Sequence, residues 1–309
     1  MNSIVTRLID VAIHISLVLT FSPLLLGVVN KVKAWFAGRN GPPLLQPYFD
    51  LSKLFRKGSV FSTTTTWVFR AGPVVGLATS GLAAMLLPLG GHPAPIAFAG
   101  DLVLFAYLFG LGRFFTVAAA LDTGSAFEGM GGAREATFAC LAEPALFLSL
   151  LVFVHGSGSL SLSSMLGSAV GELWAEVPAS LVLVLAALFL VLLVESSRVP
   201  FDDPNTHLEL TMIHEVMVLD HSGPAFGMIS YGAAIKLFVL GAIVARVALP
   251  FDTGSSFGDW GVFVGSMLAI AVVIGVIESV IARARLTQIP KLLVGACVLS
   301  SFGIAMMAR

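Results

Sequence analysis

The chain has 309 residues, of which 57% are hydrophobic and 11% are charged, and its net charge is −1. Soluble domains are about 45–50% apolar and about a quarter charged, so this composition excludes an ordinary soluble protein. The mean hydropathy of +0.96 indicates a chain that lies largely in a lipid bilayer. We expect contact with lipid and none with nucleic acid.

Eight stretches are long and apolar enough to cross a bilayer core, which takes about 20 residues per helix. Runs such as Ser180–Val194 lack the alternation of a β-barrel strand and favour helices, which satisfy their own backbone polar groups in lipid. We predict an all-α polytopic membrane protein, with one integral membrane domain over residues 1–309. The spans cover residues 10–30, 72–90, 101–121, 137–155, 179–197, 226–249, 260–281 and 290–308.

The loop after the first span contains an amphipathic helix. Tyr48 and three later apolar residues recur at helical spacing beside Asp50 and Lys53. Such a helix lies on the membrane surface or packs on a partner. Asp50 and Lys53 are three residues apart and therefore face the same neighbour. The RNGP sequence that begins at Arg39 predicts a tight turn before this helix.

Lysine and arginine are distributed unevenly between the two sets of alternate loops. Because cytoplasmic loops are enriched in these residues, the distribution places both termini outside and the polar loops inside. Arg113 and Lys236 lie within spans. The richer side holds Lys31, Lys33, Arg39, Lys53, Arg56, Lys57, Arg70, Arg134, Arg198, Arg283, Arg285 and Lys291, and the other side holds Arg7, Arg246 and Arg309.

The segment Glu195–Glu215 is unusually polar, with 6 charged residues and two histidines among 21 residues. Pro200 and Pro204 prevent it from continuing the fifth span as a straight helix. A solvated loop is the simpler interpretation, but the apolar residues at its end argue against it. We therefore expect a partner subunit to cover those residues, which are Leu208, Leu210, Met212, Ile213, Val216, Met217, Val218 and Leu219.

Charged residues also occur inside the predicted spans, where each costs about 2.5–3.5 kcal/mol on insertion scales. Ion pairs that fix the helix register are one interpretation, and snorkelling explains Glu195 alone. A row of carboxylates is better explained as a proton path, because burial raises a carboxyl pKa toward a working range. Arg134 lies nine residues from Glu143, too far to pair with it. Glu143 therefore needs another partner or a proton, and we predict that it carries a proton and that Glu195 lies nearer to water.

No catalytic motif is present: the sequence lacks CxxC, a GxGxxG after a strand, a Walker loop and HExxH. His207, His214 and His221 are spaced by seven and would share one face of an unbroken helix. The SGP sequence at 222–224 indicates that the helix ends there, which argues against a metal site. Two isolated cysteines make no cluster. We expect no catalytic, cofactor-binding or metal site in this chain.

Three segments resemble the signature loops of respiratory complex I subunit 1: RNGPPLLQPYFDLSKLF (39–55), GGAREATFACLAEP (131–144) and ESSRVPFDDPNTHLEL (195–210). The resemblance covers nearly the whole chain. In that family the subunit anchors the peripheral arm to the membrane arm and lines a quinone cavity. Its acidic loop and buried glutamates begin a proton path toward antiporter-like subunits.

The sequence departs from the quinone-reducing branch, which typically has PFDLPEAEAEL where this chain has PFDDPNTHLEL. Asp202 and Glu209 match acidic positions, but Asn205 and His207 stand where glutamates are usual. The HLELTMIHE sequence and the short first loop resemble instead the membrane subunit of group 4 [NiFe]-hydrogenases, of the hydrogenase-4 and formate hydrogenlyase type. In such complexes electrons pass through iron–sulfur proteins to a nickel–iron centre.

The resemblance implies a membrane anchor subunit of an energy-converting hydrogenase in a bacterial or archaeal cytoplasmic (inner) membrane. Its implied partners are the large and small subunits of the hydrogenase, a ferredoxin-like iron–sulfur subunit and antiporter-like subunits, and these partners hold the Fe–S clusters and the Ni–Fe centre. A quinone-site subunit of an NADH:quinone oxidoreductase-like complex is the alternative. A free-standing proton-coupled transporter predicts an inverted repeat, which the sequence lacks. The choice between protons and sodium, the direction of coupling and the electron donor stay open.

Two sets of candidate residues follow. The proton path consists of Glu143, Glu195, Asp202, Asp203, Glu209, Glu215, Glu278 and Lys236. Docking of the peripheral arm is assigned to Arg39, Asp50, Lys53, Arg134 and Arg198.

Overall fold

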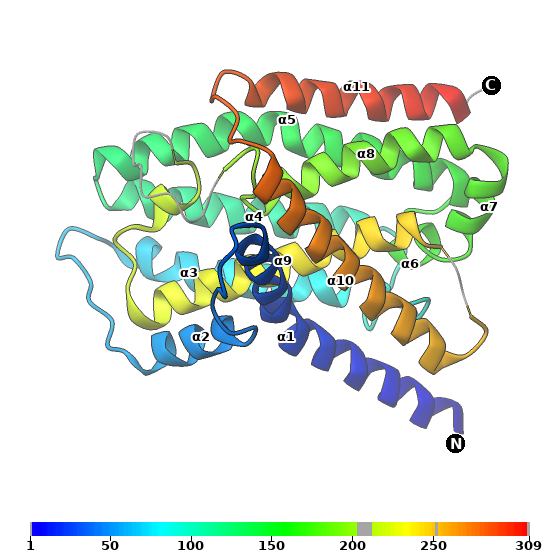
Figure 1. Cartoon of the computed structure of the whole chain (residues 1–309), viewed down its shortest axis with the longest axis horizontal. Helices are drawn as coiled ribbons and strands as arrows, with labels where there is room; N and C mark the ends of the chain where they lie inside the picture. Colours follow the sequence, from blue (N-terminus) through cyan, green and yellow to red (C-terminus); the bar gives the residue numbers. More distant parts are fainter. Residues whose placement is uncertain (1, 203–211, 251–252, 308–309) are drawn as a thin grey trace.

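The computed structural model describes residues 2–202, 212–250 and 253–307, with side chains from residue 7 onward. Within these ranges the chain forms eleven α-helices, one short 3-10 helix and no strand (Figure 1). Eight of the helices are long and apolar enough to cross a membrane. The predicted all-α, multi-pass membrane fold is confirmed.

The eight spans agree with the predicted stretches, but two helices are much longer than predicted. The first span continues beyond its predicted end at residue 30 and includes Lys31 and Lys33. The fourth span begins at Ala126, eleven residues before its predicted start at residue 137, because its glycine-rich first turns are helical. The spans are α1 (Asn2–Phe36), α3 (Trp67–Met85), α4 (Asp101–Asp122), α5 (Ala126–Ser157), α8 (Pro178–Glu195), α9 (Gly223–Ala248), α10 (Ser256–Val280) and α11 (Ile289–Met307).

Four shorter helices connect the spans: α2 (Gln46–Arg56), α6 (Leu162–Met165), α7 (Ala169–Glu176) and the 3-10 helix η1 (Glu215–Val218). The predicted amphipathic helix in the first loop is confirmed as α2. It packs on α1 and α9 (Figure 1). Its charged residues Asp50 and Lys53 are exposed.

Helix α9 lies at the centre of the bundle and packs against α1, α2, α3, α8 and α10. Helices α5, α8 and α11 pack together on one side of it (Figure 1). On another side α3 and α4 approach closely, because a Cβ at Gly72 would lie 2.9 Å from the Cβ of Ala119. Small residues at such contacts let helix backbones approach in a membrane, where the hydrophobic effect does not drive helices together.

The two ends of the bundle differ in chemistry. One end, which we call the polar end, carries α2, residues 196–202, η1 and residues 281–288. The opposite end carries α6 and α7, and both ends of the described chain lie there (Figure 1).

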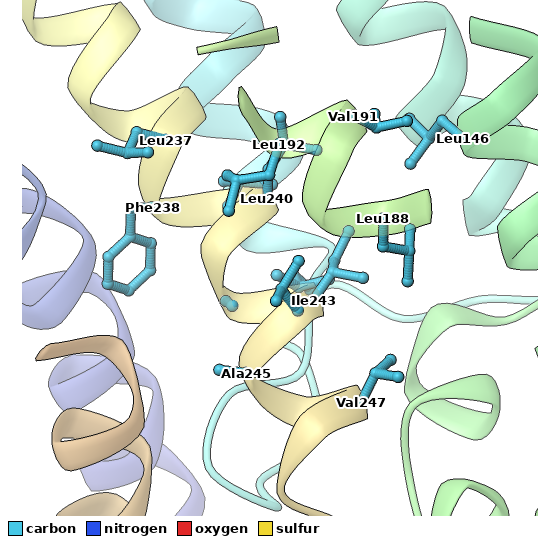
Figure 2. Packing of buried hydrophobic residues seen from close by; sticks show 14 of the residues in the cluster. Leu146, Leu188, Val191, Leu192, Leu237, Phe238, Leu240, Ile243, Ala245 and Val247 are labelled. Atoms are coloured by element: carbon cyan, nitrogen blue, oxygen red, sulfur yellow. The ribbon is translucent and has the colours of Figure 1, made fainter. Parts of the chain in front are cut away.

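The half of the bundle away from the polar end is filled mainly by apolar side chains. Leu188 of α8 and Leu240, Ile243 and Val247 of α9 belong to this buried cluster (Figure 2). At the opposite end Arg246 donates hydrogen bonds to the carbonyls of residues 166 and 167, at 2.8 and 3.1 Å. The apolar layer and this cap separate the interior from the opposite end.

The apolar residues from 212 to 218 pack inside the chain itself. Met212, Ile213, Val216, Met217 and Val218 are buried, and only Leu219 of the described set is exposed. These residues are buried because their segment packs closely against α5. Position 131 of α5 is a glycine, and a Cβ there would lie 2.4 Å from a methyl of Val216. The prediction that a partner must cover these residues is therefore wrong. Residues 208 and 210 lie outside the described residues.

A proline within α1 is compensated by a tyrosine of another helix. Pro23 has no N–H, so the carbonyl of Leu19, four residues earlier, lacks its helical donor. The hydroxyl of Tyr231 on α9 donates to this carbonyl at 2.8 Å. The hydroxyl of Tyr48 on α2 donates to the neighbouring carbonyl of Thr20. The irregular point of α1 is thus held by both α2 and α9.

Substitution of Tyr231 by phenylalanine is expected to cost about 1 kcal/mol of stability, the range measured for hydrogen bonds between membrane helices. In a Pro23→Ala background the alanine N–H can donate to the Leu19 carbonyl, so the same substitution should cost almost nothing. Thermal unfolding of the wild type and the three variants in detergent measures both costs. An equal cost in the two backgrounds would contradict this account of the hydrogen bond.

Candidate functional site

Arg113, in the middle of α4, joins carboxylates from two other helices. Its Nε donates to Glu135 of α5 at 3.0 Å, and its Nη2 donates to both oxygens of Glu195 of α8 at 2.6 and 2.7 Å. Its Nη1 donates to Glu143, also on α5. The planar guanidinium suits this role because it presents five N–H donors in a fixed fork.

The network continues toward α9 through Lys236. Its ammonium group lies 2.6 Å from the second oxygen of Glu195, which therefore contacts two cations. The same ammonium lies 5.7 Å above the ring of Phe109. Lys236 and Glu195 are thus paired within the bundle, near the middle of α9 and the end of α8.

Toward the polar end the network continues through His214 and Asp202. His214 lies between two carboxylates, with Nε2 at 3.0 Å from Glu135 and Nδ1 at 3.4 Å from Asp202. Asp202 also accepts the backbone N–H of His214 at 3.0 Å and a guanidinium hydrogen of Arg283 at 2.9 Å. Residues from α5, the loop after α8 and the loop after α10 are thereby held together.

The electrostatics of this part favour a charged histidine. Burial disfavours the imidazolium, but the Glu135 and Asp202 carboxylates outweigh burial and raise the pKa of His214 from 6.5 to about 10. Burial also opposes ionisation of Asp202, yet its contacts with His214 and Arg283 lower the pKa of this carboxyl. At neutral pH the pair is therefore an imidazolium and a carboxylate.

The eight linked residues balance in charge when His214 is protonated. Four are cations and four are anions, so neither sign is left in excess. The chain of contacts starts at the polar end and reaches the middle of the spans, since Glu135 and Glu143 are about 12 Å apart along α5. We call these residues the charge network: Arg113, His214, Lys236, Arg283, Glu135, Glu143, Glu195 and Asp202.

Of the two alternatives left for Glu143, another partner or a proton, the structure supplies a partner, because Arg113 of α4 pairs with it. Arg113 is one of the two cations that the sequence places within spans, so this contact agrees with the interpretation of the buried charges as ion pairs, whereas Arg134 on the same helix is too far away. The side chain of Glu195 is 7% exposed, whereas that of Glu143 is 42% exposed.

Glu278 belongs to a second, smaller cluster. Its carboxylate lies 2.8 Å from the ammonium of Lys33 on α1 and 3.3 Å from a guanidinium nitrogen of Arg198. The Glu278 side chain is fully buried and the Arg198 side chain is 8% exposed. Arg198 therefore lies inside the protein, and its burial argues against the predicted docking role.

The other predicted residues occupy varied positions. Glu215, at the start of η1, is half-buried and borders the cavity described below. Arg134 is half-buried and donates to the carbonyl of Met212 at 2.8 Å, which fixes the start of that segment. Arg39, like Asp50 and Lys53, is exposed at the polar end. Asp203 and Glu209 lie outside the described residues.

The three histidines do not share a helix face. His214 precedes η1, and His221 follows it and stacks on Phe69 of α3 with ring centroids 3.9 Å apart. Burial lowers the pKa of His221 to about 4, so it stays neutral. His207 lies outside the described residues.

A cavity of about 350 Å³ adjoins the charge network. Its charged lining consists of Arg113, Glu135, Glu195, Arg198, His214, Glu215 and Lys236. Its remaining surface comes mainly from small and apolar residues of α3 and α9. The space is therefore polar on one side and apolar on the other.

Sequence reasoning left out of its candidate sets five residues that the structure brings into these clusters: Lys33, Arg113, Glu135, His214 and Arg283. Glu135 lies before the predicted start of its span, in a glycine-rich stretch interpreted as a loop. Arg113 was noted as a charge in a span but was given no partner. An isolated arginine midway along an apolar run is a usable signal, because it requires an anion from another helix.

Replacement of His214 by glutamine should reduce stability in a pH-dependent manner. The folded-state pKa is raised, so the stabilisation by the imidazolium is fully present below pH 6.5 and is lost as the pH rises through about 10. Thermal unfolding of wild type and variant between pH 6 and 10 should show a difference that shrinks as the pH rises. His221→Gln, whose histidine is neutral over this range, is the control. A difference that is constant with pH would contradict the assigned charge state.

The comparisons with known proteins agree with this architecture. The sequence model of the NADH dehydrogenase family matches residues 9–308. The chain belongs to this family, the complex I subunit 1 family. The fold alone also matches a chain of the membrane-bound sulfane sulfur reductase, an archaeal respiratory membrane complex, with a TM-score of 0.81 at 21% identity, covering 98% of this chain and 100% of that chain.

Relatives in the complex I subunit 1 family come from two kinds of enzyme. Formate hydrogenlyase subunit 4 of Escherichia coli (strain K12) is 32% identical over 294 residues, covering 93% of this chain and 92% of that protein. Hydrogenase-4 component C of the same organism is 32% identical over 275 residues, covering 87% and 86%. A subunit of the NADH-quinone oxidoreductase of Rubrobacter xylanophilus is 28% identical over 264 residues, covering 83% and 79%.

Proposed function

We propose that this chain is the membrane anchor subunit of an energy-converting group 4 [NiFe]-hydrogenase complex of the formate hydrogenlyase type. It docks the peripheral electron-transfer and hydrogenase arm at its polar end and links that arm to translocation of protons or sodium ions. The observation that carries the proposal is the charge network, which runs without a break from the polar end to the middle of the spans. The 32% identity to two hydrogenase subunits supports the choice of branch.

The proposed roles of the residues in the charge network differ with their position in the bundle. His214 and Asp202 lie at the polar end, where a change in the arm reaches them first. Glu135 contacts both His214 and Arg113, so it joins the polar end to the middle of the membrane. A proton gained or lost at any member upsets the balance of four cations and four anions and changes the charge favoured at its neighbours.

The proposed chain holds no redox centre of its own. Its two cysteines are too few for an iron–sulfur cluster, which takes about four thiolates. Across residues 2–202, 212–250 and 253–307 no three His, Cys, Asp or Glu side chains are grouped so that they could hold a metal ion. We therefore assign the Fe–S clusters and the Ni–Fe centre to partner subunits. The enzyme activity belongs to the complex.

The proposed location is a bacterial or archaeal cytoplasmic membrane, with the polar end in the cytoplasm and both termini outside. The support is the excess of lysine and arginine at the polar end, where Arg39, Lys53 and Arg283 are found. Labelling of single introduced cysteines with a membrane-impermeant maleimide in intact cells measures the orientation. Labelling of cysteines at the polar end from outside the cell would show the opposite orientation.

Affinity purification of the tagged chain from native membranes tests the proposal. We expect the large and small subunits of the hydrogenase, a ferredoxin-like iron–sulfur subunit and antiporter-like membrane subunits to co-purify. Recovery of an NADH-oxidising module instead would favour the quinone branch. Recovery of the chain alone, with transport activity in liposomes, would favour a free-standing transporter.

The exposed residues of α2 and the preceding turn are the proposed anchor for the arm. Charge reversal at Lys53 or Arg39 is expected to detach the arm, because like charges brought together at an interface cost several kcal/mol. Co-purification of the hydrogenase subunits measures attachment, and the amount of chain in the membrane measures insertion. Lys291→Glu, at an exposed position at the start of α11, is the matched control. Normal co-purification of the hydrogenase subunits with both the Lys53 and the Arg39 variants would contradict the proposed anchor.

The cavity supports the alternative function, a quinone site. Its volume of about 350 Å³ lies within the range of small-molecule pockets, about 300–1,000 Å³. Its mixed polar and apolar walls suit a molecule with a polar head and an apolar body. A photoreactive quinone analogue added to the purified complex tests this function. Quinone-competed labelling of α3 or α9 would favour it, and equal labelling with and without competing quinone would count against it.

A further inference from the structure

Most cations at the polar end have a partner within the chain, as Lys33 has in Glu278. Among the residues that the structure describes, the cations without an ion pair or a side-chain hydrogen bond form two groups. The first group surrounds α2 and belongs to the proposed anchor for the arm. The second group is Arg285 and Lys291, which are exposed on either side of the start of α11. In Figure 1 the start of α11 and α2 lie on opposite sides of the molecule, so the two groups are separate.

A turn brings Arg285 and Lys291 together. The backbone N–H of Gln288 donates to the carbonyl of Arg285 at 2.8 Å, which closes a four-residue turn whose end Cα atoms are less than about 7 Å apart. Lys291 lies three residues after Gln288, in the first turn of α11. Both long side chains can therefore reach a single ligand.

Lys291 stands at the head of an exposed apolar stripe on α11. The stripe consists of Val294, Val298 and Phe302, which are all exposed. Their spacing of three, four and four residues after Lys291 places the four side chains on one face of the helix. The buried residues of α11 lie on the opposite face, which packs against α5 and α8. The stripe is therefore uncovered within this chain.

The segment that carries Arg285 is fixed to the charge network. Two residues earlier, Arg283 donates to Asp202 at 2.9 Å. The backbone N–H of Ala284 donates to the carbonyl of Pro200 at 2.8 Å. A ligand on Arg285 therefore acts on the loop that supplies a cation to Asp202.

We infer that Arg285 and Lys291 bind the headgroup of an anionic phospholipid, such as phosphatidylglycerol, in the leaflet at the polar end. The acyl chains of this lipid lie along the α11 stripe. The bound headgroup holds the loop of residues 281–288 in place and so keeps Arg283 on Asp202. The lipid contact stands on the geometry alone, whereas its effect on ion translocation rests on the proposed function.

Charge and side-chain size select this occupant. The ligand must be anionic beside Lys291 and apolar along the next three turns or so of helix, and an anionic phospholipid has this shape. Lysine and arginine at a membrane surface attract anionic lipids. A closely packed partner helix favours small residues at the contact, but the stripe consists of valine and phenylalanine. A second copy of this chain on a two-fold axis would place Lys291 against its own copy, and like charges repel.

Photolabelling of the purified complex in phosphatidylcholine vesicles tests the lipid contact. Two lipid probes carry the same diazirine acyl chain, one with a phosphatidylglycerol and one with a phosphatidylcholine headgroup, and their adducts are mapped by mass spectrometry. We expect the phosphatidylglycerol probe to label the α11 stripe about tenfold more than the phosphatidylcholine probe, because two cations attract its headgroup.

Two variants identify the residues that set this preference. The double variant Arg285→Gln, Lys291→Gln should be labelled alike by both probes, and both substitutions are at exposed positions, where the fold tolerates them. Arg7→Gln, at an exposed position near the opposite end, is the control and should keep the preference. Equal labelling of the wild type by both probes would overturn the inference. A preference that survives in the double variant, or a stripe that yields no lipid adduct because a partner subunit covers it, would do so as well.

The lipid contact and the proposed function can fail separately. Under the proposed function, ion uptake by the wild-type complex should fall several-fold when phosphatidylglycerol is left out of the vesicles, and uptake by the double variant should be low in both kinds of vesicle. If wild-type uptake is equal in both while the headgroup preference holds, the contact stands and its effect on the charge network is rejected. If the complex translocates no ions in any vesicle while the headgroup preference holds, the contact stands and the proposed function fails.

Discussion

Replacement of Arg113 by methionine is expected to prevent the protein from accumulating in the membrane. Arg113 contacts Glu135, Glu143 and Glu195 at once, and its removal leaves acids of two helices without this counter-charge. Loss of one partner of a buried pair costs about 3–5 kcal/mol, and a typical protein has only about 5–15 kcal/mol of stability. The amount of folded chain in membranes and its thermal unfolding in detergent measure the effect.

Two further variants separate charge from geometry at this position. Arg113→Lys keeps the charge but has no fork to reach acids on separate helices, so it should restore the protein only in part. The double variant Arg113→Met, Glu135→Gln removes one cation and one anion and should accumulate better than Arg113→Met alone. Accumulation of Arg113→Met at the wild-type level would show that Arg113 does not hold the acids together.

Glu135→Gln is expected to leave assembly intact and to lower ion translocation at least tenfold, with electron transfer to hydrogen persisting. Among the described residues, Glu135 is the acid that contacts both His214 and Arg113, so it joins the two halves of the network. Glutamine keeps the size of the side chain but carries neither the charge nor a transferable proton. Uptake of protons or sodium into liposomes that contain the purified complex measures the effect.

The control for this experiment lies on the same helix. Glu128 is fully buried and accepts the backbone N–H of Asp220 at 2.9 Å, but it makes no contact with the charge network. Glu128→Gln should therefore translocate ions like the wild type. If Glu135→Gln and Glu128→Gln behave alike, the network serves only to hold the helices together.

The spans could be predicted from sequence because one physical requirement sets them, the length of apolar helix that a bilayer needs. The helix α2 could also be predicted, because its polar and apolar residues alternate at the period of a helix. Both features are local: every residue that decides them lies within a few turns.

The charge network could not be predicted in the same way, because its contacts join distant parts of the chain. Arg113 meets Glu195 across 82 residues of sequence, and the arrangement depends on how α4, α5, α8 and α9 pack. Glu135 was overlooked because the span was predicted to begin at residue 137, after the stretch that contains Gly129, Gly131 and Gly132. In the structure those glycines allow close packing, such as that of residue 131 against Val216, and the helix continues through them.

The apolar layer between α8 and α9 (Figure 2) has a consequence for how this chain responds to voltage. A membrane potential does work of about 2.3 kcal/mol on one charge moved across 100 mV, and the field falls across the low-dielectric part of the protein. The charge network lies on one side of that layer and reaches only the middle of the spans. An ion that moves from His214 to Glu143 therefore crosses about half of the field at most. Under the proposed function, the charge network is therefore a vestibule near the potential of the polar-end compartment, and the larger share of the electrical work falls on the part of the path beyond this network.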